Sequence, residues 1–397
     1  MAGYMLMDRG EWGMSPLVRI DGEEGYVSLS SRRDTANPTD NYILGAKIFE
    51  RVSGNLVGDG LTVYRARRAD SSDGDYAVKF KWSDESESNE LRILNLLKER
   101  NVCGVILLDA HYVGASTEML HDGLSLGSPL TWQLGSDGSC DEIDGDMGSC
   151  SQHVRNEPKR PTCTVVTPQG RSLHNYQSIP EVLFALRDAV RAYRSLYQDG
   201  RILHRDINPS NIIIPSYGPD TDAVDAARGV LIDFDMAKEN SELYQPNQAV
   251  GTYIFQAIVV LQAYLPDNPH TYRHDLESFF YTFLFLALAR AQFRMGKINC
   301  NFPRRACCGS GTRAGWLTKR IARYKTWSRF KRRIVAEFTP EFQRLGALAE
   351  KLRAILFPVD GDGGILTGTD LTDHGTNALY DAVNGAFEDA ALEHARL

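Results

Sequence analysis

Cysteine is scarce in this sequence, and no Cys-x-x-Cys spacing occurs: the 397 residues hold seven cysteines, an odd number. This usage argues against a disulfide framework and a zinc ribbon, and reduced thiols are typical of cytoplasmic or nuclear proteins. Residues 1–13 include Asp8, Arg9 and Glu11, where a signal peptide needs an apolar core. The longest apolar run, Phe279–Ala289, is too short to span a bilayer. We therefore expect a soluble intracellular chain without a membrane partner.

An overall excess of positive charge is also lacking. Lys and Arg number 44 against 51 Asp and Glu, a net charge of −7, so nucleic acid is not an expected partner. Residues 278–336 are the exception, with 14 basic and no acidic residues. Solvated helices explain this basic stretch most simply, and a docking site for acidic partners is the alternative. At this length and 43% hydrophobic content, the chain can form two compact units.

The most informative stretch is Leu203–Asn211, a polar segment between two apolar runs. Phosphoryl transfer needs a carboxylate that orients the attacking hydroxyl and a nearby oxygen ligand for Mg²⁺. Asp206 and Asn211 have a suitable spacing, and the β-branched run Ile212–Ile214 predicts a strand at the exit of the segment. A second strand, Val230–Ile232, ends at Asp233, which offers another carboxylate for metal.

These motifs resemble the His-Arg-Asp-x-x-x-x-Asn loop and the Asp-Phe-Gly-like tripeptide of protein kinases. More narrowly, residues 41–356 resemble the fungal-type protein kinases, whose metal motif reads Asp-Phe-Asp, as at residues 233–235. Further matches are Gly251-Thr252 through Phe255, and His274–Tyr281. The resemblance implies an α+β, two-lobed fold with a small β-rich N-terminal lobe and a larger helical C-terminal lobe. It also implies ATP and Mg²⁺ as cofactors.

The resemblance assigns roles to several residues. Asp206 would act as the base or orienting group, Asn211 and Asp233 would coordinate Mg²⁺, and Lys79 would position the triphosphate. Asp275 would brace the backbone of the predicted catalytic loop, residues 203–211, from beneath, although a carboxylate at a helix start also has an ordinary capping role.

The expected nucleotide site lies in the first half of the chain. Glu90, on the helix expected after Lys79, is the expected partner of Lys79. Glu85 and Glu87 are alternatives, because the polar run at residues 83–89 allows that helix to begin at more than one position. The backbone of residues 165–169 would form the hinge that meets the adenine. The remaining residues expected around the nucleotide are Gly58, Gly60, Val63, Ala77 and Val166.

Three departures from the kinase pattern bear on activity. Asn208 stands where most serine/threonine kinases have a lysine and where fungal-type kinases usually have a serine. Asp235 replaces a glycine, as is usual in the fungal-type kinases. Val259 stands where kinases carry the glutamate of the Ala-Pro-Glu motif, which should loosen the anchor of the activation segment. Phosphorylation of Ser241 or Tyr244 could order that segment by pairing with Arg205, and a short solvated loop is the alternative.

The domain boundaries expected from the sequence place residues 1–40 in a flexible tail and residues 41–169 in the N-terminal lobe, with a disordered insertion at about 114–160. The C-terminal lobe would span residues 170–358, and residues 359–397 would form a polar tail with at most a short helix at 378–391. Within the lobes, the sequence patterns predict a strand at Val102–Leu108 and helices at Ile179–Gln198 and Leu276–Ala289.

The sequence therefore predicts an ATP-dependent protein kinase that phosphorylates a protein hydroxyl, with Ser or Thr as the expected acceptor. A pseudokinase that binds nucleotide and partner proteins is the alternative. Asn208 and Val259 favour it, as does the glycine-rich loop expected near residue 58, where only Gly58 clearly matches the kinase pattern. A small-molecule phosphotransferase shares the loop chemistry, but it would lack the Gly251-Thr252 segment and the helix start at Asp275.

Overall fold

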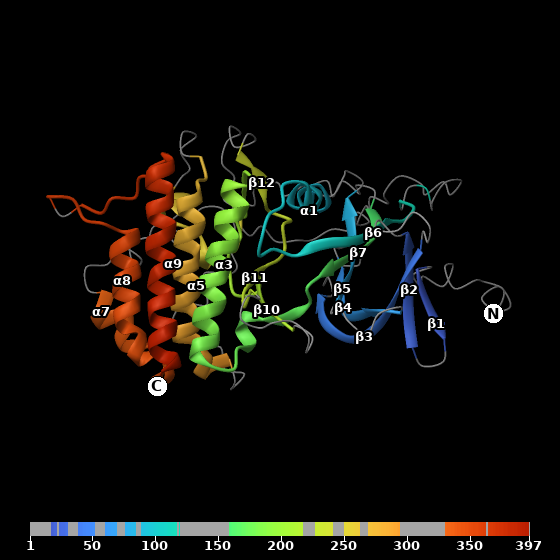
Figure 1. Cartoon of the computed structure of the whole chain (residues 1–397), viewed down its shortest axis with the longest axis horizontal. Helices are drawn as coiled ribbons and strands as arrows, with labels where there is room; N and C mark the ends of the chain where they lie inside the picture. The colour runs from blue at the N-terminus through green and yellow to red at the C-terminus, as the bar shows by residue number, and fades with distance from the viewer. Residues whose placement is uncertain are drawn as a thin grey trace, which may run out of the picture.

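The chain forms an α+β structure in the computed structural model, with strands in the N-terminal part and helices in the C-terminal part (Figure 1). The structure describes residues 17–21, 24–30, 39–51, 60–69, 76–84, 89–116, 119, 159–216, 227–240, 250–262, 269–293, 330–362 and 364–396. Gly58, Glu85, Glu87, Ser241 and Tyr244 lie outside these residues, as do most of the predicted insertion and most of the basic stretch. None of the helices in the described ranges is both long enough and apolar enough to span a bilayer.

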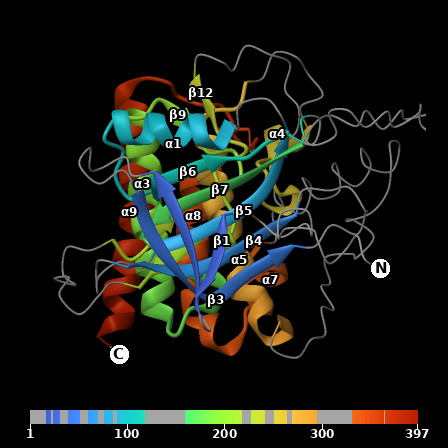
Figure 2. The same ribbon diagram turned by 90° about the vertical axis from the view of Figure 1, so that its right-hand side faces the viewer.

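Seven strands of the described N-terminal part form one antiparallel sheet, which is strongly curled (Figure 2). Their order in the sheet is β1-β2-β3-β4-β5-β7-β6. The strands are β1 (Val18–Asp21), β2 (Glu24–Ser30), β3 (Thr39–Arg51), β4 (Leu61–Arg68), β5 (Tyr76–Asp84), β6 (Leu107–Val113) and β7 (Lys159–Thr167).

Two expectations about this sheet are wrong. Residues 18–21 and 24–30 were expected in a flexible tail, but they form β1 and β2, and Val27 and Leu29 are buried in the core of the sheet. Two buried positions that alternate with serines are too short a pattern to identify a strand by periodicity. The strand expected at Val102–Leu108 begins only at Leu107, and the five residues before it form a loop.

The alternation of side chains along β5 gives the sheet its two faces. Val78 is fully buried and lies opposite Val165 of β7, within the small core of the sheet. Because successive side chains of a strand point to opposite faces, Lys79 and Lys81 lie on the other face. That face lines the large cavity described below.

The C-terminal part is built from helices that pack side by side (Figure 1). Helix α5 begins with charged residues and continues with a largely apolar stretch, in which Phe283 is fully buried and meets Phe387 of α9 edge to face at 6.0 Å. A helical stretch that is apolar all round is expected to be buried on all sides. The helices of this part are α3 (Ile179–Gln198), α4 (Ile258–Gln262), α5 (Tyr272–Phe293), α7 (Phe330–Arg333), α8 (Gly346–Leu356) and α9 (Asp373–Ala395). Helix α1 (Asn89–Glu99) belongs to the N-terminal part and contacts β6.

Helix α3 forms with the bounds that the sequence predicts. The Ser178 side chain caps its N-terminus by accepting a hydrogen bond from the backbone of Glu181 at 3.3 Å, and Pro180 occupies the first turn. The apolar positions at helical spacing, among them Leu186 and Val190, are buried. The prediction for Leu276–Ala289 is also confirmed, within the longer helix α5.

The short helix expected at residues 378–391 is confirmed within the longer helix α9, but the expectation of a polar tail at residues 359–397 is wrong. Helix α9 begins after the capping residue Thr372 and packs along α3, with Tyr380, Val383 and Phe387 buried. Its contact face is completed by alanines, which are small enough to let the helices approach closely but carry little hydrophobic signal in the sequence. The expectation failed because this buried face is rich in small residues.

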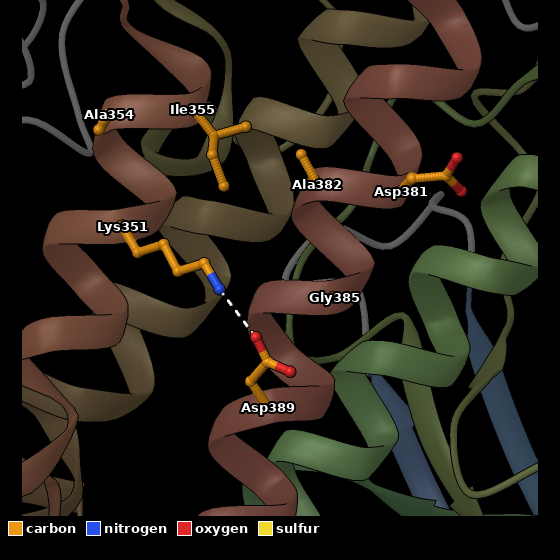
Figure 3. Close-up of a pocket in the computed structure, with 7 residues that line it drawn as sticks. All are labelled: Lys351, Ala354, Ile355, Asp381, Ala382, Gly385 and Asp389. Carbon is orange, nitrogen blue, oxygen red and sulfur yellow. Dashed lines mark hydrogen bonds and ion pairs between the residues drawn. The ribbon is translucent and has the colours of Figure 1, made fainter.

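Helices α8 and α9 leave a shallow hollow of about 520 Å³ between them (Figure 3). Ala354, Ile355, Ala382 and Gly385 line it, and the ion pair between Lys351 and Asp389, at 2.9 Å, crosses it. The hollow is open and shares no residue with the larger cavity.

Short strands connect the helical part to the segments that carry the catalytic motifs. A three-stranded sheet has the order β11-β10-β8, and β12 pairs with β9. The sequence predicts β10 and β11, and both are confirmed. The bounds are β8 (Gly170–Ser172), β9 (Ile202–Leu203), β10 (Ile212–Pro215), β11 (Val230–Leu231) and β12 (Lys238–Glu239), and 3₁₀ turns occur at Leu173–Asn175, Tyr253–Phe255, Val335–Glu337 and Pro340–Leu345.

Candidate active site

A cavity of about 1860 Å³ is lined by residues from both the N-terminal sheet and the helical part. From the sheet side come Val63, Ala77, Lys79 and Val166, all expected around a nucleotide. From the helical side come the residues with expected catalytic or metal-binding roles, Asp206, Asn211 and Asp233. Gly60, just before β4, is half-buried and does not line the cavity.

The carboxylate of Asp206 is held from both sides. Its Oδ1 accepts a hydrogen bond from the backbone N–H of Thr252 at 2.6 Å, and its Oδ2 accepts one from Nδ2 of Asn211 at 3.0 Å. The same Asn211 nitrogen donates to the carbonyl oxygen of Asp206 at 2.9 Å. Because the amide nitrogen of Asn211 is used in this way, its oxygen faces away from Asp206 and can serve as a metal ligand.

Asn208 links the catalytic loop to the segment that contains Thr252. Its Nδ2 donates to the Thr252 hydroxyl at 3.3 Å and to the Asp206 carbonyl at 3.2 Å, and its Oδ1 accepts from the Ser210 N–H at 2.8 Å. The position therefore carries a neutral bridge where most serine/threonine kinases have a cation. Any negative charge that develops near Asp206 must be balanced by other groups.

Asp275 supports the catalytic loop from below, as the resemblance implies. Its Oδ2 accepts hydrogen bonds from the backbone N–H groups of His204 and Arg205, at 3.0 and 3.1 Å, and its Oδ1 lies 2.8 Å from Nε2 of His270. Arg205 has a φ of 69°, a left-handed conformation that is uncommon for a residue with a side chain. The buried carboxylate thus holds the loop in a conformation that it would not readily adopt alone.

We expect Asp275 to make the stability of the protein sensitive to acid. Burial alone would raise the pKa of Asp275, but His270 and the backbone N–H of Arg205 outweigh it and lower the pKa from 3.8 to about 2. A lowered pKa adds stability above 3.8 that is lost as the pH falls towards 2, by about 2 kcal/mol. The difference in unfolding free energy between the native protein and Asp275→Asn should therefore shrink by that amount over this interval. Urea titrations at several pH values would measure it, and a constant difference would contradict the assignment.

Lys79 of β5 forms a buried ion pair with Glu90 of α1. The Lys79 Nζ lies 2.8 and 2.7 Å from the two carboxylate oxygens of Glu90, and this is the contact expected from the sequence. Burial would lower the pKa of Lys79, but Glu90, Asp233 and Asp235 outweigh it and raise the pKa, so the ammonium group stays charged. The pair fixes a cation at the wall of the cavity.

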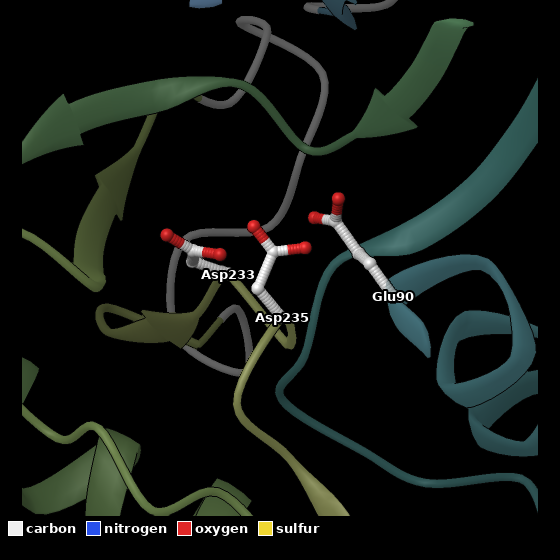
Figure 4. Close-up of side chains that lie close together, drawn as sticks. All are labelled: Glu90, Asp233 and Asp235. Atoms are coloured by element: carbon white, nitrogen blue, oxygen red, sulfur yellow. The ribbon is translucent and has the colours of Figure 1, made fainter. Parts of the chain in front are cut away.

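Three carboxylates, from Glu90, Asp233 and Asp235, lie together (Figure 4). Their nearest oxygens all lie within 4.8 Å of one another. Lys81 pairs with Asp235 at 2.7 Å, so two lysines face three carboxylates and negative charge is in excess. Burial would raise the pKa of Asp235, but Lys79 and Lys81 lower it, which keeps that carboxylate ionised.

The arrangement around Asp233 fits a divalent cation. Asp233 has a φ of 65°, and among the described residues its Oδ1 is buried without a hydrogen-bond donor. An unpartnered buried carboxylate oxygen is costly unless another group satisfies it. Carboxylate and amide oxygens are the protein ligands that Mg²⁺ prefers, and Asp233 and Asn211 both supply them at the cavity.

Helix α1 is tied to the chain that follows Asp233. Asn89 donates to the backbone carbonyls of Asp235 and Ala237, each at 2.9 Å. Glu239 accepts from Arg92 at 2.9 Å and from Arg100 at 2.5 Å. These contacts keep α1 in the orientation that places Glu90 next to Lys79. Both arginines are held by the carboxylate of Glu239, without a phosphate group.

Sequence reasoning did not assign a role to Thr252, Lys81, Asn89 or Glu239. Lys81 had a usable signal, since it lies two residues after Lys79 on the same face of a strand. The contacts of Thr252 and Asn89 involve backbone atoms, which the sequence does not mark. Glu239 pairs with arginines more than a hundred residues away, and no local pattern reveals that contact.

Comparison with known proteins places the chain in a family. The profile of the family described as "Fungal protein kinase" matches residues 1–287, well over half of the chain. A region of 107 residues is 31% identical to the probable serine/threonine-protein kinase gdt4 of Dictyostelium discoideum. That region is 27% of this chain and only 6% of the Dictyostelium protein. The chain belongs to the fungal protein kinase family.

Proposed function

We propose that this protein transfers the γ-phosphoryl group of ATP to a serine or threonine hydroxyl of a protein, with Mg²⁺ as cofactor. One observation carries the proposal: the Lys79–Glu90 pair and the held carboxylate of Asp206 face the same cavity. Phosphoryl transfer needs a cation at the phosphates and a carboxylate at the incoming hydroxyl. In this proposal the N-terminal sheet and the helical part act as two lobes around the cavity.

Asp206 would orient the acceptor hydroxyl and accept its proton. The carboxylate is fixed by Thr252 and Asn211, so it would not need to reorganise as the reaction proceeds. At the other wall, Lys79 would hold the α- and β-phosphates. Val63, Ala77 and Val166 give the sheet side of the cavity an apolar character that suits the adenine ring.

Asn211 and Asp233 would hold the metal. When bound, Mg²⁺ neutralises charge on the phosphates during phosphoryl transfer. The excess of carboxylates at Glu90, Asp233 and Asp235 would otherwise repel the anionic nucleotide, which is why a divalent cation is needed here. Because Asn208 is neutral, Lys79 and the metal would supply the positive charge near the transferred group.

The protein substrate is expected to donate an aliphatic hydroxyl. The Dictyostelium relative is named as a probable serine/threonine-protein kinase, which favours that acceptor. The basic stretch could in addition dock acidic partner proteins, although most of it lies outside the described residues. A cytoplasmic or nuclear location would suit both the cysteine usage and the need for ATP.

The test is label transfer from γ-labelled ATP to a generic protein substrate, followed by acid hydrolysis to identify the labelled amino acid. We expect phosphoserine or phosphothreonine, and we expect chelation of divalent cations with EDTA to stop the transfer and added Mg²⁺ to restore it. Labelled tyrosine would overturn the assignment of the acceptor. If no label reaches any protein while ATP still raises the melting temperature, the proposed activity is wrong.

A further inference from the structure

The segment 250–258 forms one wall of the candidate active site. Its Thr252 donates to Asp206, and Ile254 and Phe255 line the cavity. Gly251 has a φ of 101°, and a side chain there would collide with the carbonyl oxygen of Arg205, so the segment lies directly against the catalytic loop. Its geometry at Asp206 therefore depends on how firmly its far end is held.

The usual anchor for that end is missing, because Val259 replaces the glutamate of the Ala-Pro-Glu motif. Another carboxylate meets the segment one residue earlier. Oε1 of Glu277, on α5, accepts a hydrogen bond from the backbone N–H of Ile258 at 2.7 Å. Glu277 is fully buried, and a hydrogen bond to a charged acceptor is about twice as strong as one between neutral groups.

The Glu277 carboxylate is itself held in place. Arg273 lies one helical turn away, and its Nη1 is 3.2 Å from Oε2 of Glu277. The same guanidinium donates to the carbonyl oxygen of Leu356 and lies over the ring of Phe357, so α5 is also joined to the end of α8. The hydroxyl of Tyr281 donates to Oε1 at 2.5 Å.

We propose that Glu277, supported by Arg273, is a positioning residue that replaces the missing glutamate and fixes segment 250–258 as the platform for the protein substrate. This inference rests on the proposed kinase activity. Glu277 does more than neutralise Arg273, because its Oε1 accepts a hydrogen bond from the backbone N–H of Ile258, which belongs to segment 250–258. Losing that acceptor would leave the Ile258 N–H buried and unpaired, and the segment would shift to satisfy it.

The experiment compares two double variants that remove the same two charges. The first, Arg273→Met with Glu277→Leu, replaces the pair by apolar side chains, which avoids an uncompensated buried charge. The second, Arg273→Gln with Glu277→Gln, is the matched control, because it keeps an amide oxygen at position 277 that can accept from Ile258. Both are compared with the native protein below their melting temperatures.

Two readouts test the inference. Hydrogen exchange followed by mass spectrometry should show faster exchange in the peptide that contains Ile258 for the apolar pair, with little change in the rest of the chain. The KM for a generic protein substrate should rise by about tenfold or more, while the KM for ATP stays unchanged. The variant Arg273→Gln with Glu277→Gln should remain close to the native protein in hydrogen exchange near Ile258 and in the KM for the protein substrate.

The inference is overturned if the two double variants behave alike in exchange and in both KM values. It is also overturned if the KM for ATP rises together with the KM for the protein substrate. Failure of the proposed activity is a separate result: if the native protein transfers no phosphate, the exchange comparison still decides whether Glu277 anchors the segment.

Discussion

Replacing Asp206 with asparagine is expected to lower the rate of phosphoryl transfer by about 10²–10⁴-fold, the usual contribution of a positioned general base. The substitution keeps the size and shape of the side chain and one acceptor for the Thr252 N–H. It removes the charge that would orient the acceptor hydroxyl and receive its proton. Affinity for ATP should not fall, because Lys79, Ala77 and Val166 are unchanged.

The measurement is steady-state transfer of label from ATP to a protein substrate, with ATP binding followed separately by calorimetry. Asp381→Asn is a suitable matched control, since it makes the same chemical change on an exposed part of α9 outside the cavity. Transfer by Asp206→Asn at the rate of the control would show that Asp206 is not the base. Loss of ATP binding along with transfer would point to a disturbed loop and not to lost chemistry.

The catalytic loop could be predicted from the sequence because its contacts are local. Asp206 and Asn211 are five residues apart, and the side chain of one binds the other. Strand β10, which follows the loop, and strand β11, which leads to Asp233, are short apolar runs and were also predicted. Where the chemistry depends on neighbours in the sequence, spacing alone conveys much of the geometry.

The rest of the site depends on contacts that spacing does not reveal. Lys81 and Asp235 are 154 residues apart, and Glu277 binds the backbone of Ile258 on a different helix. Similarly, α9 has a contact face of alanines, and the buried residues of β2 alternate over only two positions. In each case the deciding factor is what lies opposite in the fold, which a sequence pattern cannot supply.

Replacing Lys79 with methionine is expected to lower the transfer rate by at least about 10²-fold, as removal of one preorganised donor to a reacting charge typically does. It should also lower the melting temperature. The variant leaves Glu90 buried, with Asp233 and Asp235 close by and only Lys81 to balance them. Transfer assays and thermal unfolding would measure the two effects independently.

The pH dependence of the Lys79→Met variant follows from Glu90. Burial raises the pKa of Glu90 above 4.5, with Asp235 and Asp233 adding to the effect and Lys79 opposing it. Without the lysine, Glu90 should take up a proton in the folded state. A carboxyl group whose pKa is raised by folding binds more protons when folded, so stability falls as the pH rises above 4.5. The melting temperature of the variant should therefore fall further below that of the native protein as the pH rises from 4.5 to neutral.

The double variant Lys79→Met, Glu90→Gln is the matched control for this prediction. It removes the unpaired buried carboxyl group, so it should regain stability and lose the additional pH dependence, while transfer stays as low as in Lys79→Met. A double variant that keeps the pH dependence would mean that the other carboxylates, and not Glu90, cause it. A double variant that regains transfer would show that Lys79 does not hold the phosphates.

Glu90→Gln alone separates two roles of the ion pair, which are to hold the Lys79 cation at the phosphates and to orient α1. This variant keeps Lys79, whose ammonium group can still be held by Asp233 and Asp235, and α1 keeps its contacts through Asn89 and Glu239. Transfer should therefore fall less than in Lys79→Met, because the cation that meets the phosphates is still present. If both single variants lose transfer equally, the orientation of α1 depends on Glu90 itself, and the contacts of Glu239 are not sufficient to hold the helix.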